Sequence, residues 1–253
     1  MTPDWASHLV LALAAAVAGA LNVVAGGGSF LVLPVMIFLG LPATVANGTN
    51  RIGILAQNAT AVWGFHQHRL IEGGWIAVAV VPALAGAALG TWAAIVIEDA
   101  AFRRALAFIM VAVSLWTLWD PLAHRRPQER AGLQGRLGRI WSVLLFFAIG
   151  VYGGFVQAGI GFLLLAATTL QGLDLVRGNA LKVLIVLVFT PLTLVLFALG
   201  GKVDWGLGLA LAAGYGAGGL AGVRLTVRKG HAWLKRVVTV TVIVFAILLW
   251  FSP

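Results

Sequence analysis

The sequence predicts an all-α integral membrane protein with about ten apolar helical segments in two inverted five-segment repeats. Three observations predict this fold class. The 253 residues are 61% hydrophobic and 10% charged, whereas soluble domains carry about 25% charged residues. Most apolar residues lie in runs close to the length of about 20 residues with which a helix crosses a bilayer. The order of these runs in the first half of the chain recurs in the second half.

The composition also excludes several classes of protein. The formal net charge is +9, but the basic residues lie between apolar runs and not on one polar face, so we expect no nucleic-acid partner. The chain has no cysteine, which excludes a disulfide framework and a thiolate metal site. It contains no phosphate-binding loop, dinucleotide fingerprint or nucleophile elbow. We therefore expect a membrane protein that holds no cofactor and is not an enzyme.

The apolar runs define the helical segments, five on each side of an arginine-rich linker. The first run resembles a secretory signal, but the only charge before it is Asp4, and a cleaved signal begins with basic residues. The second segment of each half is too short to cross a hydrocarbon core of about 30 Å, so we expect it to be broken or re-entrant. The predicted segments are 5–24, 29–40, 44–65, 74–97 and 100–119, then 140–157, 161–171, 177–199, 205–223 and 232–251.

The two halves of the chain align when one is shifted by about 132 residues. In this register the glycine-rich stretches coincide, and Asn47 meets Asn179. Internal duplication of this kind is common in secondary transporters. We assign the first transmembrane repeat to residues 1–119, a basic cytoplasmic linker to 120–138 and the second transmembrane repeat to 139–253.

Positive charge predicts the orientation, because Lys and Arg favour the cytoplasmic side of a membrane. The basic linker and the stretch 224–236 are the strongest cytoplasmic signals. If each half crosses the membrane five times, both termini lie outside and the halves are inverted, which is the arrangement we favour. If each short segment is only re-entrant, each half crosses four times and the repeats run parallel.

Each half is interrupted by glycines immediately before its short segment, at 25–29 and at 158–161. Glycine lets the backbone leave a helix and lets a ligand approach closely. The helix N-terminus that follows carries about half a positive charge and unpaired N–H donors, so two such ends brought together near the midplane would bind an anion. The alternative role is close helix packing, which we prefer for Gly86 and Gly90. The backbone donors predicted to bind substrate belong to Gly27, Gly28, Ser29, Gly159 and Gly161.

The ionisable residues indicate the charge of the substrate. All eight acidic residues fall at segment ends or in loops, so we expect no carboxylate in the membrane interior. Arg51 and Lys182 lie within apolar segments, where an ionisable residue is costly and usually functional, unless its side chain extends to the interface. This imbalance favours an anionic substrate. The uncharged polar residues predicted to complete the site are Asn47, Thr49, Asn50, Gln157 and Asn179.

Two stretches carry a family resemblance. Gly-Gly-Gly-Ser-Phe-Leu-Val-Leu-Pro (26–34), followed by Gly-Leu-Pro-Ala-Thr-Val-Ala-Asn-Gly-Thr-Asn (40–50), resembles the first signature of the sulfite exporter TauE/SafE family of permeases. The stretch from Gly150 through Gly161 to Trp205 is similar to the second signature of that family. The resemblance covers nearly the whole chain.

The resemblance implies a multi-pass permease of the bacterial inner membrane for sulfur-containing or organic anions. It also implies that the glycine breaks and the stretch 45–49 line the path. Two positions depart from the family pattern: Ile160 replaces a third glycine, and Lys182 replaces a small or polar residue. The added charge at Lys182 favours a strongly charged anion.

Together these observations predict a secondary transporter that moves a small sulfur-containing oxyanion or organosulfonate, such as sulfite or sulfoacetate, by alternating access. Its expected partners are this anion and the lipid bilayer. The alternatives are a passive anion channel, a membrane-embedded enzyme that uses His66, His68 or Arg51, and a structural subunit.

Overall fold

The computed structural model describes residues 5–24, 26–71, 73–119 and 135–250. Within these ranges the chain is helical and contains no strand, which confirms the all-α prediction. The described helices begin and end within a few residues of the predicted segments, apart from α4 and the last two segments. The α-helices are α1 (Trp5–Val24), α2 (Ser29–Phe38), α3 (Ala43–Gln67), α4 (Val81–Val96), α5 (Asp99–Trp119), α6 (Arg136–Phe155), α7 (Ile160–Leu170), α8 (Leu175–Leu199) and α9 (Trp205–Trp250).

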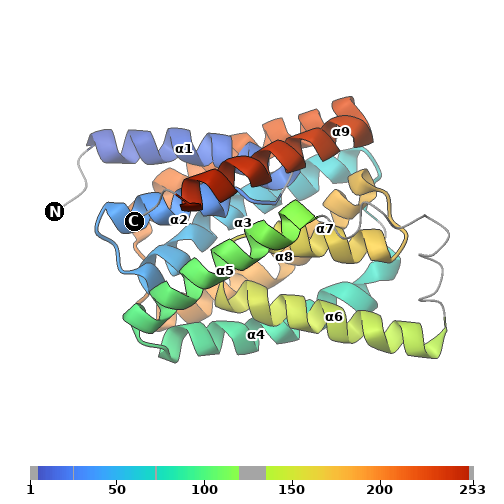
Figure 1. Cartoon of the computed structure of the whole chain (residues 1–253), viewed down its shortest axis with the longest axis horizontal. Helices are drawn as coiled ribbons and strands as arrows, with labels where there is room; N and C mark the ends of the chain where they lie inside the picture. Colours follow the sequence, from blue (N-terminus) through green and yellow to red (C-terminus); the bar gives the residue numbers. More distant parts are fainter. Residues whose placement is uncertain (1–4, 25, 72, 120–134, 251–253) are drawn as a thin grey trace.

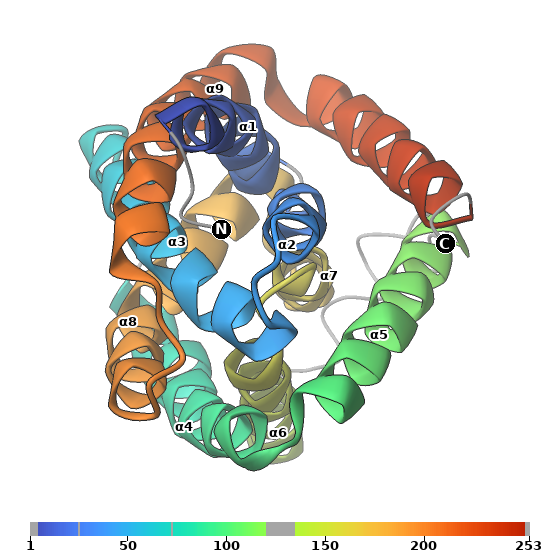
Figure 2. The ribbon, with the colours of Figure 1, turned by 90° about the vertical axis from the view of Figure 1, so that its left-hand side faces the viewer.

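Two details differ from the predicted segments. The chain enters α4 through a short 3-10 turn, Gly73–Trp75, and a π-helical turn, Ile76–Val80. The last two predicted segments form one helical stretch, α9, which turns sharply between two straighter parts (Figure 2). The polar stretch between these segments contains no proline, and its Lys, Arg and Leu residues are compatible with a helix, so helical backbone continues through it.

The described helices are apolar on their outer surfaces as well as in the core. Four of them are long and apolar enough to cross a membrane. Phe108, Leu137 and Leu199 are exposed by 74%, 76% and 81%. Large exposed apolar side chains of this kind fit a surface that contacts lipid and not water.

The short helices fold back on the helices that precede them. A Cβ added at Gly28 would lie 2.0 Å from the carbonyl oxygen of Ala18, so the start of α2 packs against α1. In the second half, a Cβ at Gly153 would lie 2.1 Å from Ile160 Cδ1. Seen along the long axis, α2 and α7 lie near the centre of the bundle, surrounded by the other helices (Figure 2).

Two pairs of helices at corresponding positions in the two halves have equal lengths, and one of these pairs runs in opposite directions. α3 and α8 are both 25 residues long, and α1 and α6 are both 20 residues long. In Figure 1, α1 begins at the left-hand end of the molecule and α6 at the right-hand end, and each runs toward the middle.

Glycines allow the closest helix contacts, which lie between α4 and α6 and between α1 and α9. A Cβ at Gly90 would lie 1.9 Å from the carbonyl oxygen of Val151. In the other pair, a Cβ at Gly218 would lie 2.2 Å from the carbonyl oxygen of Ala16. Backbones can approach this closely only where a side chain is absent, which confirms the packing role predicted for Gly90.

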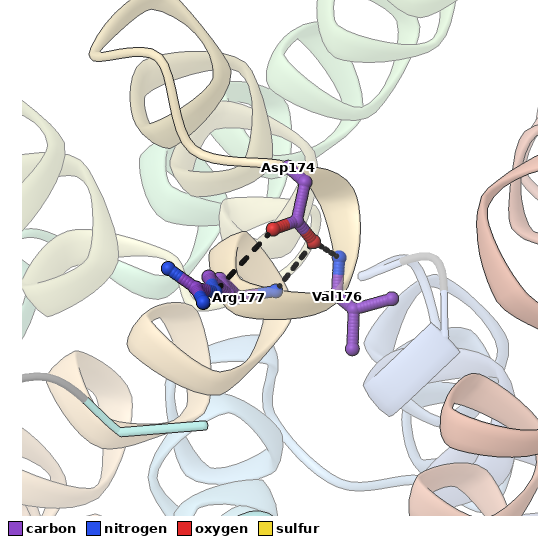
Figure 3. Close-up of polar contacts among 3 residues, drawn as sticks. All are labelled: Asp174, Val176 and Arg177. Atoms are coloured by element: carbon purple, nitrogen blue, oxygen red, sulfur yellow. Dashed lines mark hydrogen bonds and ion pairs between the residues drawn. The ribbon is translucent and has the colours of Figure 1, made fainter. Parts of the chain in front are cut away.

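Carboxylates cap α3 and α8, the long helices that follow the two short helices. Asp174 is the N-cap of α8, where its Oδ1 accepts hydrogen bonds from the N–H groups of Val176 (2.9 Å) and Arg177 (3.1 Å), as Figure 3 shows. Its Oδ2 also lies 3.6 Å from Arg177 Nε. The N-cap of α3 is Pro42, whose side chain has no acceptor. The cap of α3 comes instead from Asp99 at the start of α5, whose carboxylate accepts hydrogen bonds from the N–H groups of Ala43 and Thr44.

Candidate functional site

The two glycine breaks meet in the interior of the protein. A Cβ at Gly26 would lie 2.5 Å from the Cα of Gly161, and a Cβ at Gly161 would lie 2.3 Å from the Cα of Gly26. Beside this contact the rings of Phe30 and Phe162 stack, with centroids 6.3 Å apart and planes inclined by 28°. The first turns of α2 and α7 therefore begin at one crossing, as the sequence predicts.

Local backbone geometry explains why each helix stops at its break. Gly26 has φ +98° and Gly159 has φ +75°, a left-handed region that other residues rarely adopt. Within the breaks, the N–H of Phe30 bonds the carbonyl of Gly27 (3.0 Å), and the N–H of Phe162 bonds the carbonyl of Gly159 (3.0 Å). These short turns start α2 and α7 in their new directions.

A basic and an amide side chain from α8 hold the C-terminal end of α1. Lys182 Nζ donates hydrogen bonds to the carbonyl oxygens of Asn22 (2.9 Å) and Val23 (2.7 Å). Asn179 Nδ2 donates to the next carbonyl, that of Val24, at 3.4 Å. Both side chains are at least 97% buried, with exposures of 3% and 0%.

The same arrangement recurs at the C-terminal end of α6, with the donors now on α3. Arg51 Nη2 donates to the carbonyl oxygens of Gly153 (3.2 Å) and Gly154 (2.6 Å). Asn47 Nδ2 donates to the carbonyl of Phe155 at 2.9 Å. Each interrupted helix is thus capped by an asparagine and a cation from the other half of the chain.

These contacts give both buried cations a defined electrostatic partner. The last carbonyls of a helix carry about half a negative charge, so a cation next to them is stabilised without a carboxylate. Arg51 also donates from Nη1 to Thr193 Oγ1 (2.9 Å) and lies 4.6 Å above the ring of Phe197. Within the described residues, no ion pair joins Arg51 or Lys182 to an acidic side chain.

Asn50 belongs to a buried hydrogen-bond chain at the start of α2. Its Nδ2 donates to Ser29 Oγ at 3.1 Å, and its Oδ1 accepts from Tyr215 Oη at 3.1 Å. Tyr215 comes from α9 and was not among the predicted site residues. Its sequence neighbours are glycines and alanines of a packing stretch, and nothing in them indicates a hydrogen-bonded tyrosine.

The remaining predicted polar residues separate into two groups. Gln157 lies immediately before the second break and donates from Nε2 to Thr190 Oγ1 at 3.2 Å. Thr49 is fully buried but its Oγ1 accepts from the N–H of Asp204 at 2.8 Å. Asp204 lies in the loop before α9, so this hydrogen bond ties Thr49 to a loop and not to either break.

Four buried polar atoms at the breaks have no hydrogen-bond partner within the described part of the chain. One is a donor, Arg51 Nε. The other three are amide oxygens, Asn47 Oδ1, Asn179 Oδ1 and Gln157 Oε1. Unpartnered buried polar atoms are rare in folded proteins, and their concentration here marks the crossing as the candidate site.

Comparison with known proteins identifies the family. The sequence pattern of the sulfite exporter TauE/SafE family matches residues 11–249. A probable membrane transporter protein of Haemophilus influenzae is 28% identical over 88% of this chain and 87% of its own length. The probable membrane transporter protein YfcA of Escherichia coli K12 is 27% identical over 96% and 90% of the two chains. No solved structure gives a significant match.

The family match covers both glycine breaks, both buried cations and most of every described helix. The chain therefore belongs to the sulfite exporter TauE/SafE family of membrane transporters.

Proposed function

We propose that this protein is a secondary permease that moves a small sulfur-containing oxyanion or organosulfonate, such as sulfite or sulfoacetate, across the bacterial inner membrane. The substrate sits beside the crossing of the two glycine breaks. The backbone N–H groups that bind its oxygens belong to Gly27, Gly28, Ser29, Gly159 and Gly161, since helix N-termini favour anions. Arg51 and Lys182 give the region its positive charge.

The unpartnered Nε of Arg51 is the observation that carries this proposal. It belongs to a side chain with 0% exposure, and an unpaired charged donor in such a place is costly. The backbone carbonyls and Thr193 use the other nitrogens of the guanidinium. An oxyanion would supply the missing acceptor together with compensating charge.

An inverted repeat accounts for the arrangement of the helices. Ala43 and Leu175, which begin two helices of equal length, are 132 positions apart, and α1 and α6 run in opposite directions (Figure 1). The opposite directions of α1 and α6 (Figure 1) favour the inverted arrangement over the parallel one.

Alternating access follows from such a repeat when one half rocks against the other around a fixed site. The moving units are the proposed repeats, residues 1–119 and 139–253, joined by the basic stretch 120–138. α6 begins at Arg136, so the end of this linker is already helical. The caps on α1 and α6 join the two halves directly, because the side chains that cap each of these helices come from the other half.

Reconstituted transport tests the proposal. Purified protein in liposomes is expected to take up a labelled sulfonate or sulfur oxyanion saturably, and excess unlabelled anion should compete. We expect Lys182→Ala to lose this uptake and Lys202→Ala, a charge change in the loop before α9, to retain it.

Three results would contradict the proposal. Equal loss of uptake in both variants would show that Lys182 does not supply the positive charge that binds the substrate. Uptake of a cation alone would reverse the sign of the substrate. Single-channel conductance far above carrier turnover would make the protein a passive channel.

A further inference from the structure

The three unpartnered amide oxygens at the breaks have orientations that the surrounding protein fixes. Asn47 Nδ2 faces the carbonyl of Phe155 and Asn179 Nδ2 faces the carbonyl of Val24. Turning either amide over would place its oxygen against a carbonyl oxygen, which is repulsive. Their Oδ1 atoms therefore point away from the helix ends that they cap.

Gln157 is fixed in the same way by a threonine. Thr190 Oγ1 donates its proton to the carbonyl of Val186 at 2.6 Å, so toward Gln157 this hydroxyl can only accept. It accepts from Gln157 Nε2 at 3.2 Å, which leaves Gln157 Oε1 as the unpartnered atom.

These oxygens require hydrogen-bond donors. Asn47 and Asn179 have 0% exposure and Gln157 has 2%, so bulk water does not supply the donors. A bare oxyanion accepts hydrogen bonds and would be repelled by acceptor oxygens. It would satisfy Arg51 Nε and leave all three amide oxygens unpartnered.

The type of donor follows from the charge at the breaks. A ligand with an ammonium group would meet Lys182 and Arg51, the two buried cations that cap the same helix ends. Like charges in a poorly screened interior repel strongly. A neutral hydroxyl supplies a donor without this cost.

We propose that the site recognises an anion that also carries a hydroxyl donor: a hydroxy-substituted sulfonate, or an oxyanion that keeps one proton. The inference rests on the proposed function and narrows its substrate class. The negative end binds the helix N-termini and the cations, while the hydroxyl donates to the amide oxygens of Asn47, Asn179 or Gln157.

Matched sulfonates test this inference by binding titration of the purified full-length protein. The probes are ethanesulfonate, 2-hydroxyethanesulfonate and 2-aminoethanesulfonate, which differ in one substituent. We expect the hydroxy compound to bind at least about tenfold more tightly than ethanesulfonate, because a site with unpaired polar groups rejects a ligand that cannot pair them. The amino compound should bind less tightly than the hydroxy compound.

Substitutions of the amide side chains test which oxygens accept the hydrogen bond from the hydroxyl. We measure the ratio of the affinity for 2-hydroxyethanesulfonate to the affinity for ethanesulfonate. In Asn47→Ala, and in Gln157→Met, which keeps the length of the side chain, we expect this ratio to fall toward one. Asn58→Ala is the matched control, because Asn58 is buried on the same helix as Asn47 but bonds the carbonyl of Ile54 within its own helix (2.8 Å). It should keep the preference.

The outcomes separate the two proposals. Equal affinity for ethanesulfonate and its hydroxy derivative would overturn the inference and leave anion transport standing. Absence of binding by every sulfonate and oxyanion would overturn both. Stabilisation by Na⁺ alone that is lost in Asn47→Ala would also overturn the inference, since the oxygens would then be cation ligands.

Discussion

The backbone of Gly26 lies directly against the backbone of Gly161, so the two helix breaks touch where they cross. The first atoms that a side chain on either residue would meet are main-chain atoms of the other break. Main-chain atoms cannot move aside as the end of a flexible side chain can. The crossing, and with it the placement of the α2 and α7 N-termini, depends on the absence of both side chains.

Alanine at either position is expected to destabilise the protein. In Gly161→Ala the added Cβ overlaps the backbone of Gly26, and overpacking in a core costs about 1–3 kcal/mol. Gly26→Ala adds strain from its φ of +98°, about 1–3 kcal/mol more. The temperature at which half of the detergent-solubilised protein unfolds measures both effects.

Gly216→Ala is the control for these variants. Gly216 lies within α9, and its added Cβ would approach no atom outside its own stretch of helix closer than 4.0 Å. Since alanine favours a helix over glycine by about 1 kcal/mol, this variant should be as stable as wild type or more stable. A Gly161→Ala variant as stable as Gly216→Ala would show that the crossing does not need glycine.

The sequence predicts the helices and their breaks because these are local features. Apolar runs and glycines determine where each helix starts and stops, and the shift between Asn47 and Asn179 reveals two corresponding positions. The partners of Arg51 and Lys182 could not be predicted in this way. They are backbone carbonyls of a helix more than a hundred residues away, and every residue has a backbone carbonyl, so the sequence does not distinguish these.

Two other contacts were out of reach for the same reason. Tyr215 bonds Asn50 only because α9 packs against α3. Asp99 caps α3 only because the start of α5 lies beside the start of α3. One comparison does hint at the second contact: Pro42 aligns with the N-cap Asp174, so α3 needs a cap from elsewhere.

The hydrogen bond between Arg51 and Thr193 provides a second prediction. Thr193 Oγ1 accepts from Arg51 Nη1 and donates to the carbonyl of Thr190, each at 2.9 Å. Thr193→Val keeps the shape of the side chain but leaves a charged donor unpaired. Hydrogen bonds to charged groups contribute about 1.5–3 kcal/mol, so a clear fall in thermal stability is expected.

Thr226→Val is the matched control for Thr193→Val. Thr226 is fully buried, and its Oγ1 has no partner among the described residues. Burying an unpaired hydroxyl is unfavourable, so this substitution should leave stability unchanged or raise it. If both valine variants unfold at the same temperature, the bond to Arg51 contributes nothing measurable.

The chain from Tyr215 through Asn50 to Ser29 gives a third prediction. Tyr215→Phe removes the donor to Asn50 Oδ1, and an unsatisfied buried acceptor costs about 1–3 kcal/mol. Asn50→Ala removes that acceptor, so Tyr215→Phe should cost less in the Asn50→Ala background. Unfolding temperatures of the four proteins of this double-mutant cycle measure the coupling. Additive effects would mean that the two side chains do not interact.

Asp99 gives the pH dependence of stability at the start of α3. Burial acts to raise the pKa of Asp99, but hydrogen bonds from the backbone and side chain of Thr44 and from the backbone of Ala43 act to lower it, together with the charge of Lys202. The net effect is a pKa below the ordinary value. The bonds from Thr44 are both 2.8 Å and the bond from Ala43 is 3.2 Å.

A carboxylate whose pKa is depressed by folding stabilises the protein above its unfolded pKa, and this contribution is lost as the pH falls through the folded pKa. We therefore expect the unfolding temperature to fall on acidification below about pH 5, within the titration range of carboxylates. Asp99→Asn should lower the unfolding temperature at pH 7 and make the acidic decline shallower. Glu98→Gln removes the same charge from the neighbouring, exposed position and should leave the decline intact. If the unfolding temperature of Asp99→Asn falls as steeply with acidification as that of wild type, the acid sensitivity comes from other carboxylates. The cap on α3 then acts through geometry and not through charge.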